Sequence, residues 1–145
     1  MEMTFTIPGE PQGKARHRAF LDKKKERLIF KTPDKTVDYE QLVALCFLGT
    51  RGRFIFTGQQ PIRADILAYY RIPNKTSKVN RQLMLTDKIR PTKKPDIDNI
   101  TKIIYDGLNG VAWHDDAQIV EGNTSKHYAE EPRVVVTLST LINTD

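Results

Sequence analysis

The 145-residue sequence has one cysteine, three histidines and no long apolar run. Because Cys46 has no second cysteine to pair with, we expect a reduced thiol, which suits a cytoplasmic protein. The longest apolar run is much shorter than the roughly 20 residues that a membrane-spanning helix needs, and the N-terminus lacks the pattern of a signal peptide. The three histidines show no ligand spacing, which argues against a zinc site.

Basic residues are in excess, and they are unevenly distributed along the chain. The sequence has 23 Lys and Arg against 18 Asp and Glu, for a formal charge of +5. Residues 1–94 contain 20 of the basic and 9 of the acidic residues, whereas residues 95–145 contain 3 basic and 9 acidic residues. A basic region favours a polyanion partner and a separate acidic region favours a metal site. Two solvated surfaces of different charge would give the same pattern.

Apolar periodicity predicts one small domain with both helices and strands. Alternation predicts strands over residues 4–8, 62–72, 117–124 and 133–141, and helical spacing predicts helices over 36–48 and 98–108. Two basic segments, 9–31 and 74–95, are predicted to be loops, with a hairpin near 28–30 and a helical turn near 84–85. This order predicts a single α+β domain over residues 1–145, with a mixed sheet and two main helices. In the first helix we expect the core-facing stripe to be Val37, Leu42, Leu45 and Leu48.

Two pairs of aspartates stand close together in the C-terminal half. Asp96 and Asp98 are one residue apart, so in an extended segment they point to the same side. Asp115 and Asp116 begin a predicted strand, and if that strand packs beside the helix start, the four carboxylates meet. Carboxylates so close repel unless a proton or a cation neutralises them, and hard oxygen ligands favour Mg²⁺ or Mn²⁺. Such an ion activates water for phosphodiester hydrolysis.

One lysine accompanies the aspartates, and each aspartate also has a simpler explanation. Lys102 follows Asp98 by four residues and lies on nearly the same helix face, where it could stabilise charge developing on a phosphate. However, Asp98 can be a helix N-cap, Asp96 can precede a helix because its charge is favourable there, and Asp115–Asp116 can form a turn. Asp106 is expected to pair with Lys102 or with solvent rather than to bind metal.

The combination of these motifs resembles the RusA family of Holliday junction resolvases. The matching pattern is Asp96-Ile97-Asp98-Asn99, then Lys102, then Asp106-Gly107-Leu108, then the stretch from Asp115 to Val120. The order of predicted elements is also similar, so that the resemblance covers nearly the whole chain and is strongest over residues 61–141. It implies that Asp96, Asp98 and Asp116 are catalytic metal ligands, that Asp115 assists them, and that Lys102 is important for cleavage.

The resemblance also implies a function and partners. A member of this family is expected to be a Mg²⁺-dependent homodimer that cuts four-way DNA junctions in recombination and repair. The long basic loop over residues 9–31 departs from the family pattern, which bears on junction specificity more than on hydrolysis. Two other functions stay open: a nuclease for other branched DNA such as forks or flaps, and a non-catalytic basic DNA-binding module.

Overall fold

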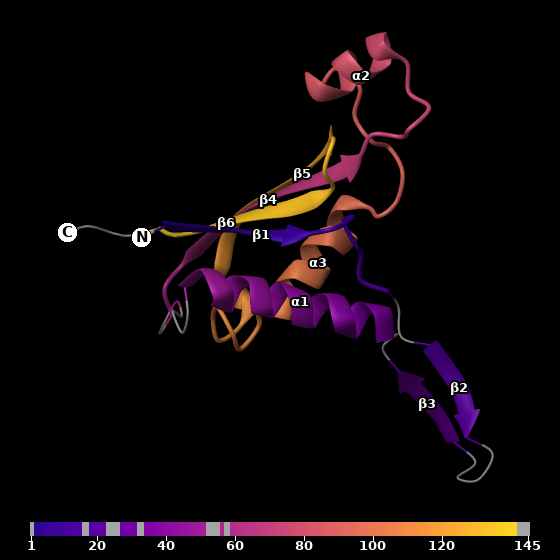
Figure 1. The fold of residues 1–145 in the computed structure, drawn as a ribbon. Helices are drawn as coiled ribbons and strands as arrows, with labels where there is room; N and C mark the ends of the chain where they lie inside the picture. The colour runs from indigo at the N-terminus through magenta and orange to yellow at the C-terminus, as the bar shows by residue number, and fades with distance from the viewer. Residues whose placement is uncertain are drawn as a thin grey trace.

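A four-stranded mixed sheet forms the centre of the fold (Figure 1). The computed structural model describes residues 2–15, 18–22, 27–31, 34–51, 56 and 59–141, with the backbone alone for 18–22, 27–31 and 51. The strand order is β1-β6-β4-β5, in which β4 and β5 are parallel and the other neighbours are antiparallel. The elements in chain order are β1 (Glu2–Pro8), β2 (Arg18–Asp22), β3 (Arg27–Lys31), α1 (Asp34–Arg51), β4 (Ile62–Arg71), α2 (Lys78–Leu85), α3 (Ile97–Leu108), η1 (Asp116–Gln118), β5 (Ile119–Ala129) and β6 (Arg133–Thr140).

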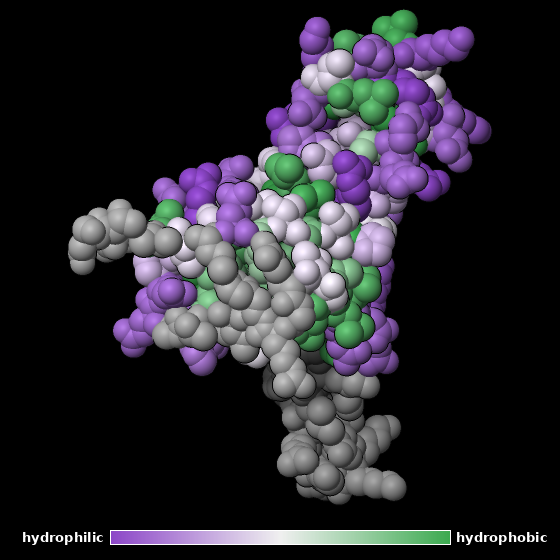
Figure 2. Space-filling view, turned by 60° about the vertical axis from the view of Figure 1, so that its left-hand side comes forward, coloured by the Kyte–Doolittle hydropathy of each residue, from purple (hydrophilic) through white to green (hydrophobic). Residues whose placement is uncertain are grey.

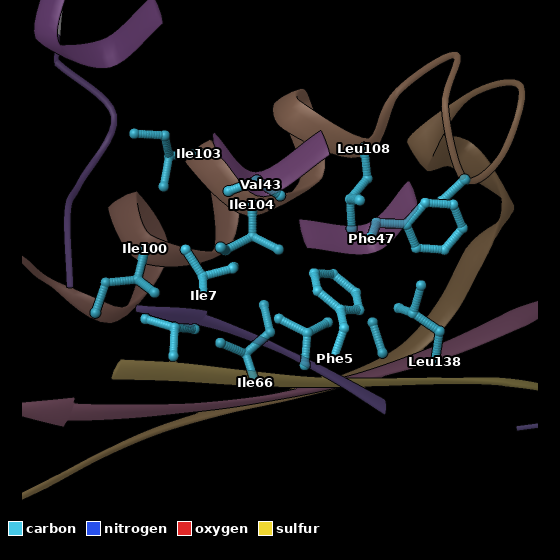
Figure 3. Close-up of a cluster of buried hydrophobic side chains, with 14 of the residues drawn as sticks. Phe5, Ile7, Val43, Phe47, Ile66, Ile100, Ile103, Ile104, Leu108 and Leu138 are labelled. Atoms are coloured by element: carbon cyan, nitrogen blue, oxygen red, sulfur yellow. The ribbon is translucent and has the colours of Figure 1, made fainter. Parts of the chain in front are cut away.

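The predicted alternation of β4 is confirmed, and its apolar side faces the core. Ile62, Ala64 and Ile66 are buried, whereas the residues between them are half-exposed. Helices α1 and α3 cover this one face of the sheet (Figure 1). The sheet and the two helices therefore enclose a single hydrophobic core, which confirms the α+β fold (Figure 3); its labelled side chains are Phe5, Ile7, Val43, Phe47, Ile66, Ile100, Ile103, Ile104, Leu108 and Leu138.

Of the four residues of α1 that were predicted to face the core, Leu42 packs against it, whereas Val37, Leu45 and Leu48 are exposed. Helix α1 begins at Asp34 and continues past Gly49 to Arg51. Its inward residues are Tyr39, Val43 and Phe47, and the Phe47 ring packs edge-on against Phe5 with centroids 5.6 Å apart. Since α1 carries two apolar stripes, the stripe with two aromatic rings buries more apolar area and turns inward. The exposed fractions of the other stripe are Val37 37%, Leu45 66% and Leu48 37%.

Close contact between α1 and α3 places a lysine of the first basic segment inside the fold. A Cβ at Gly107 would lie 2.9 Å from the Glu40 backbone oxygen, so only glycine permits this approach. Beside it, the Lys14 Nζ binds Glu40 and lies 3.1 Å from the Asp106 carboxylate. Burial alone would lower the pKa of Lys14, but hydrogen bonds to these two carboxylates raise it above its ordinary value. Lys14 thus joins the N-terminal segment to both helices.

The segment between β4 and α3 forms an arm, residues 73–95, that projects from the sheet (Figure 1). The predicted helical turn is a full helix, α2, because Ser77 caps it: its Oγ accepts a hydrogen bond from the Asn80 N–H at 3.2 Å. No residue of α2 is buried, and hydrophilic side chains cover most of the visible arm (Figure 2). Its exposed lysines are Lys75, Lys78, Lys88, Lys93 and Lys94.

Several polar contacts join the arm to β5 and to the turn that follows it. The Arg81 guanidinium lies 2.6 Å from Glu130, and the His127 Nδ1 lies 2.9 Å from Asp87. Arg90 donates from Nε to the Lys126 backbone oxygen at 2.9 Å. The arm therefore has a defined position beside the sheet, although little apolar surface holds it there.

Candidate active site at the two ends of α3

At its N-terminal end, α3 begins with Asp96 as the N-cap, not Asp98. Asp96 has an extended backbone, and its carbonyl oxygen accepts the Ile100 N–H at 3.0 Å. Its side chain makes no capping hydrogen bond, and Asp98 lies exposed in the first turn. Capping therefore occupies neither carboxylate, and both remain able to bind a ligand.

The end of strand β4 positions the segment before Asp96. Tyr70 is buried under this segment, and its hydroxyl donates to the Pro95 backbone oxygen at 2.9 Å. Burial raises the pKa of Tyr70 to about 12, and the negative charges of Glu10 and Asp96 add to this effect. The hydroxyl therefore stays protonated and keeps donating at neutral pH.

The first basic segment packs against Pro95 and Asn99, which flank the same aspartates. A Cβ at Gly13 would lie 2.7 Å from the Pro95 Cβ and 3.1 Å from the Asn99 Cβ. The next residue, Lys14, donates its backbone N–H to the Asn99 oxygen at 3.0 Å. Gly13 is needed for this close approach, which fixes the first turn of α3 between the N-terminal segment and β4.

At the other end of α3, the second aspartate pair lies in a tight turn. The 3₁₀ turn η1 covers Asp116–Gln118, and β5 begins after it at Ile119. The Gln118 Oε1 accepts backbone N–H groups from His114 at 2.9 Å and Asp115 at 3.3 Å. Its Nε2 donates to the Gln60 backbone oxygen at 3.3 Å. Gln118 thus holds the aspartate turn closed and joins it to the chain before β4.

The surroundings of Asp116 are electrostatically unfavourable for its charged form. Burial raises the pKa of Asp116, and the neighbouring Asp115 and Asp106 carboxyls raise it further, while a hydrogen bond from Asn109 opposes them. The pKa of Tyr105 is also raised, first by burial and then by the negative charges of Asp116 and Asp65. Excess negative charge in a half-buried place is relieved by a proton or by a bound cation.

The two aspartate pairs lie at opposite ends of α3, contrary to the expectation that they meet at the helix start. Thr101 in the helix bonds Thr124 at 2.7 Å between hydroxyls, and Tyr105 contacts Gly122, so α3 and β5 run antiparallel. This follows from the parallel β4 and β5, because the helix that connects parallel strands must run back along the sheet. The turn that follows α3 can therefore lie only at its C-terminal end.

The helix length sets the separation of the two ends. At 1.5 Å per residue, the eleven steps from Asp98 to Asn109 correspond to about 17 Å along the axis. Within the described part of the chain, no three His, Cys, Asp or Glu side chains form a group that could hold a metal ion.

Lys102 lies between the two ends of α3, 62% exposed, with its Nζ 3.6 Å from Asp106. The predicted Lys102–Asp106 pair is thus confirmed.

Comparison with known proteins decides the family. The family model described as Endodeoxyribonuclease RusA matches residues 8–139 of the chain. The chain belongs to the RusA endodeoxyribonuclease family. The Bacillus subtilis (strain 168) protein YqaN, which its name describes as uncharacterized, is 36% identical over 134 residues, covering 91% of this chain and 92% of YqaN.

The RusA match contains both ends of the candidate site, and membership of the family indicates a nuclease, a hydrolase of DNA. Among the residues that the structure describes, no helix has the length and apolar character to cross a membrane.

The oxygen donors present fit Mg²⁺ in kind. Mg²⁺ in phosphate-processing proteins is commonly bound through one or two carboxylates, with water and substrate phosphates completing its coordination. Asp96 and Asp98 could supply these carboxylates at one end of α3, and Asp115 and Asp116 at the other. The carboxylate pair at either end of α3 therefore matches this mode of binding in kind and in number.

Sequence reasoning missed two residues beside the aspartates: Asn109, which lowers the pKa of Asp116, and Tyr70, which bonds the segment before Asp96. Asn109 follows Leu108 and precedes Gly110, a pattern that indicates only a helix C-cap. Tyr70 lies within the strand predicted over residues 62–72, and that pattern does not indicate a contact of its hydroxyl with a loop. The one signal in the sequence is that Tyr70 stands three residues before Pro73. A proline ends a strand, so this tyrosine lies near the strand end, where a side chain can reach a loop.

Proposed function

We propose that this RusA-family protein is a Mg²⁺-dependent endonuclease that resolves four-way DNA junctions in recombination and repair. The observation that carries the proposal is the family match over residues 8–139, which includes every candidate site residue. Two structural features support it: carboxylates that capping does not use at the N-terminal end of α3, and a half-buried, negatively charged turn at the other end.

The roles of the side chains follow from their positions. When bound, Mg²⁺ would polarise a phosphoryl oxygen and supply a hydroxide nucleophile at neutral pH. Asp96 and Asp98 would hold it at the exposed end of α3, and Asp116 with Asp115 at the other end. Lys102 is exposed one turn from Asp98, where its ammonium can stabilise the negative charge that develops on the transferred phosphoryl group.

The arm is the part of the protein best suited to hold DNA. Its five exposed lysines present positive charge on a projecting, hydrophilic surface that ends directly before Asp96. Contacts of this kind bind the phosphate backbone and read little base sequence. Lys14 belongs to the first basic segment, but Glu40 and Asp106 bind its ammonium, so we do not count it among the phosphate contacts.

We further propose a homodimer. Resolving a junction requires a cut in each of two strands, and a twofold-symmetric dimer presents two identical sites to them. Light scattering of the purified protein at several concentrations tests this: the expected mass is twice the 16.7 kDa of one chain. A monomeric mass at concentrations that support cleavage would contradict it.

A panel of DNA substrates tests the proposed function directly. Labelled four-way junctions, forks, flaps and linear duplexes are incubated with the protein in Mg²⁺ and in EDTA. Our proposal expects paired cuts near the junction centre, in Mg²⁺ only. Faster cutting of forks or flaps would favour the nuclease for other branched DNA, and a mobility shift without cutting in Mg²⁺ or Mn²⁺ would favour the non-catalytic binding module.

A further inference from the structure

Asn109, the residue that ends α3, is fixed in place by its neighbours. Its backbone N–H donates to the Tyr105 oxygen at 2.9 Å. Its side-chain Oδ1 accepts the indole N–H of Trp113 at 2.6 Å. Trp113 is 1% exposed and packs edge-on against the Tyr105 ring, with centroids 5.9 Å apart. An exposed side chain is thus oriented by a buried one.

The chemistry of the indole decides which way the Asn109 amide faces. An indole N–H can only donate, so the oxygen of the amide must face Trp113 and the amide NH₂ must face away from it. The Asn109 side chain also lowers the pKa of the Asp116 carboxyl, as a hydrogen-bond donor beside a carboxylate does. The NH₂ group is therefore the donor, and it is a neutral donor among the negative groups Asp115, Asp116 and Asp106.

We propose that Asn109 is a positioning residue for Asp116, with Trp113 setting the direction of its amide. The NH₂ group holds one side of the Asp116 carboxylate and leaves its remaining lone pairs for a divalent cation. Residues that orient metal-binding groups in this way typically change metal affinity or activity by about 10- to 100-fold when they are removed. The inference rests on the proposed Mg²⁺-dependent function, because Asn109 acts through Asp116 and touches no substrate.

Two substitutions separate this role from a merely structural one. Asn109→Ala removes the donor to Asp116, and Trp113→Phe keeps an aromatic ring in the core but removes the N–H that orients the amide. Because the two changes act through the same hydrogen-bonded amide, their effects should not add. The double variant should have the metal affinity of Asn109→Ala alone. The control is Asn123→Ala, an exposed asparagine on β5 whose neighbour Gly122, not Asn123, faces α3.

The measurements are calorimetric Mn²⁺ and Mg²⁺ binding to the DNA-free protein, and single-turnover junction cleavage over a range of Mg²⁺ concentrations. We expect Asn109→Ala to weaken metal binding and to raise the half-saturating Mg²⁺ by roughly 10-fold or more. The cleavage rate at saturating Mg²⁺ should fall less, and junction affinity in EDTA should stay within about twofold of the unmodified protein. Trp113→Phe should shift the metal dependence in the same direction by a smaller factor.

Wild-type metal dependence in Asn109→Ala, or additive effects in the double variant, would overturn the inference and leave the proposed function intact. A lowered melting temperature with unchanged half-saturating Mg²⁺ would show a structural role only, and would also overturn it. If the unmodified protein neither bound Mg²⁺ nor cut DNA, the proposed function itself would fail. These outcomes are distinguishable because metal binding is measured without DNA.

Discussion

The two ends of α3 carry the same pair of side chains in opposite environments. At the N-terminal end, Asp96 and Asp98 are exposed, and the backbone around them is fixed by Tyr70 and by the packing of Gly13. At the C-terminal end, Asp116 is half-buried and its pKa is raised by burial and by its acidic neighbours. Backbone position organises the first pair, and side-chain contacts organise the second.

This difference indicates how the two ends could divide the work. Exposed carboxylates beside a basic arm can approach a phosphate that the arm holds, and they retain their hydration until DNA arrives. A crowded carboxylate pair gains more from a cation, because neutralisation relieves repulsion that the fold has already imposed. The C-terminal pair is therefore expected to bind Mg²⁺ more tightly in the absence of DNA, and the N-terminal pair to contribute mainly in its presence.

The largest expected effect is the loss of cleavage when either end is neutralised. Asp98→Asn and Asp116→Asn should each reduce single-turnover junction cleavage by at least roughly 10³-fold, about 4 kcal/mol. Junction binding should persist, because removing a negative charge cannot weaken attraction to phosphate. The control is Asp38→Asn, an exposed aspartate on α1. If one of the two variants cut at nearly the wild-type rate, only the other end of α3 would belong to the active site.

Whether the sequence predicts a feature of the fold or of the candidate site depends on how far apart in the chain the interacting residues are. Local patterns predicted β4 and the apolar face of α3, because burial imposes a period on neighbouring residues. They also predicted the Lys102–Asp106 pair, which depends only on helix geometry. The separation of the aspartate pairs depends on strand pairing: only the parallel register of β4 and β5 requires α3 to run back along the sheet. Nothing within the motif carries that information.

The same reason explains the incorrect stripe on α1. Both faces of this helix have apolar residues at helical spacing, so periodicity alone could not decide between Leu45 and Phe47. The partners decide it: Phe5 on β1 receives the Phe47 ring, and Gly107 on α3 leaves room for Val43. These partners are distant in sequence, and their positions are known only once the sheet and helices are assembled.

A second prediction concerns the arm, which adjoins only the N-terminal end of α3. If six to ten basic groups of the arm and of the first basic segment contact phosphates, junction affinity should fall by on the order of 10³-fold or more between 50 and 200 mM salt. Replacing Lys75, Lys78 or Lys88 with glutamine should each lower the slope of log affinity against log salt by about 1. Lys14→Gln should leave the slope unchanged, because carboxylates already bind that ammonium. Fluorescence anisotropy in EDTA measures these slopes, and a flat salt dependence would show that the arm is only solvated surface.

A third prediction tests whether Lys102 takes part in catalysis or only pairs with Asp106. Lys102→Ala should lower the cleavage rate by roughly 10²-fold, about 2.7 kcal/mol, if the ammonium stabilises transition-state charge. If it only pairs with Asp106 on the helix surface, the substitution should cost a few tenths of a kcal/mol in stability and leave the rate unchanged. Single-turnover cleavage and thermal melting of the same variant distinguish these cases, with Lys35→Ala on α1 as the control. An unchanged rate would exclude Lys102 from the chemistry.

The smallest expected effect is on the stability of the metal-free protein, and it separates the two ends by pH. A carboxyl whose pKa is higher in the folded than in the unfolded protein favours folding when protonated. For Asp116 the metal-free protein should therefore lose stability as pH rises from the ordinary aspartate value through the raised folded pKa. Asp116→Asn removes this penalty, so in EDTA it should raise the melting temperature on the order of 1 to 3 °C at pH 7. At a pH below both values the gain should disappear. Asp98→Asn should not raise the melting temperature at pH 7, because it removes a negative charge from the first turn of α3, where such a charge is favourable. Equal gains at pH 7 in both variants would show that the crowding of carboxylates at the C-terminal end of α3 does not distinguish it from the N-terminal end.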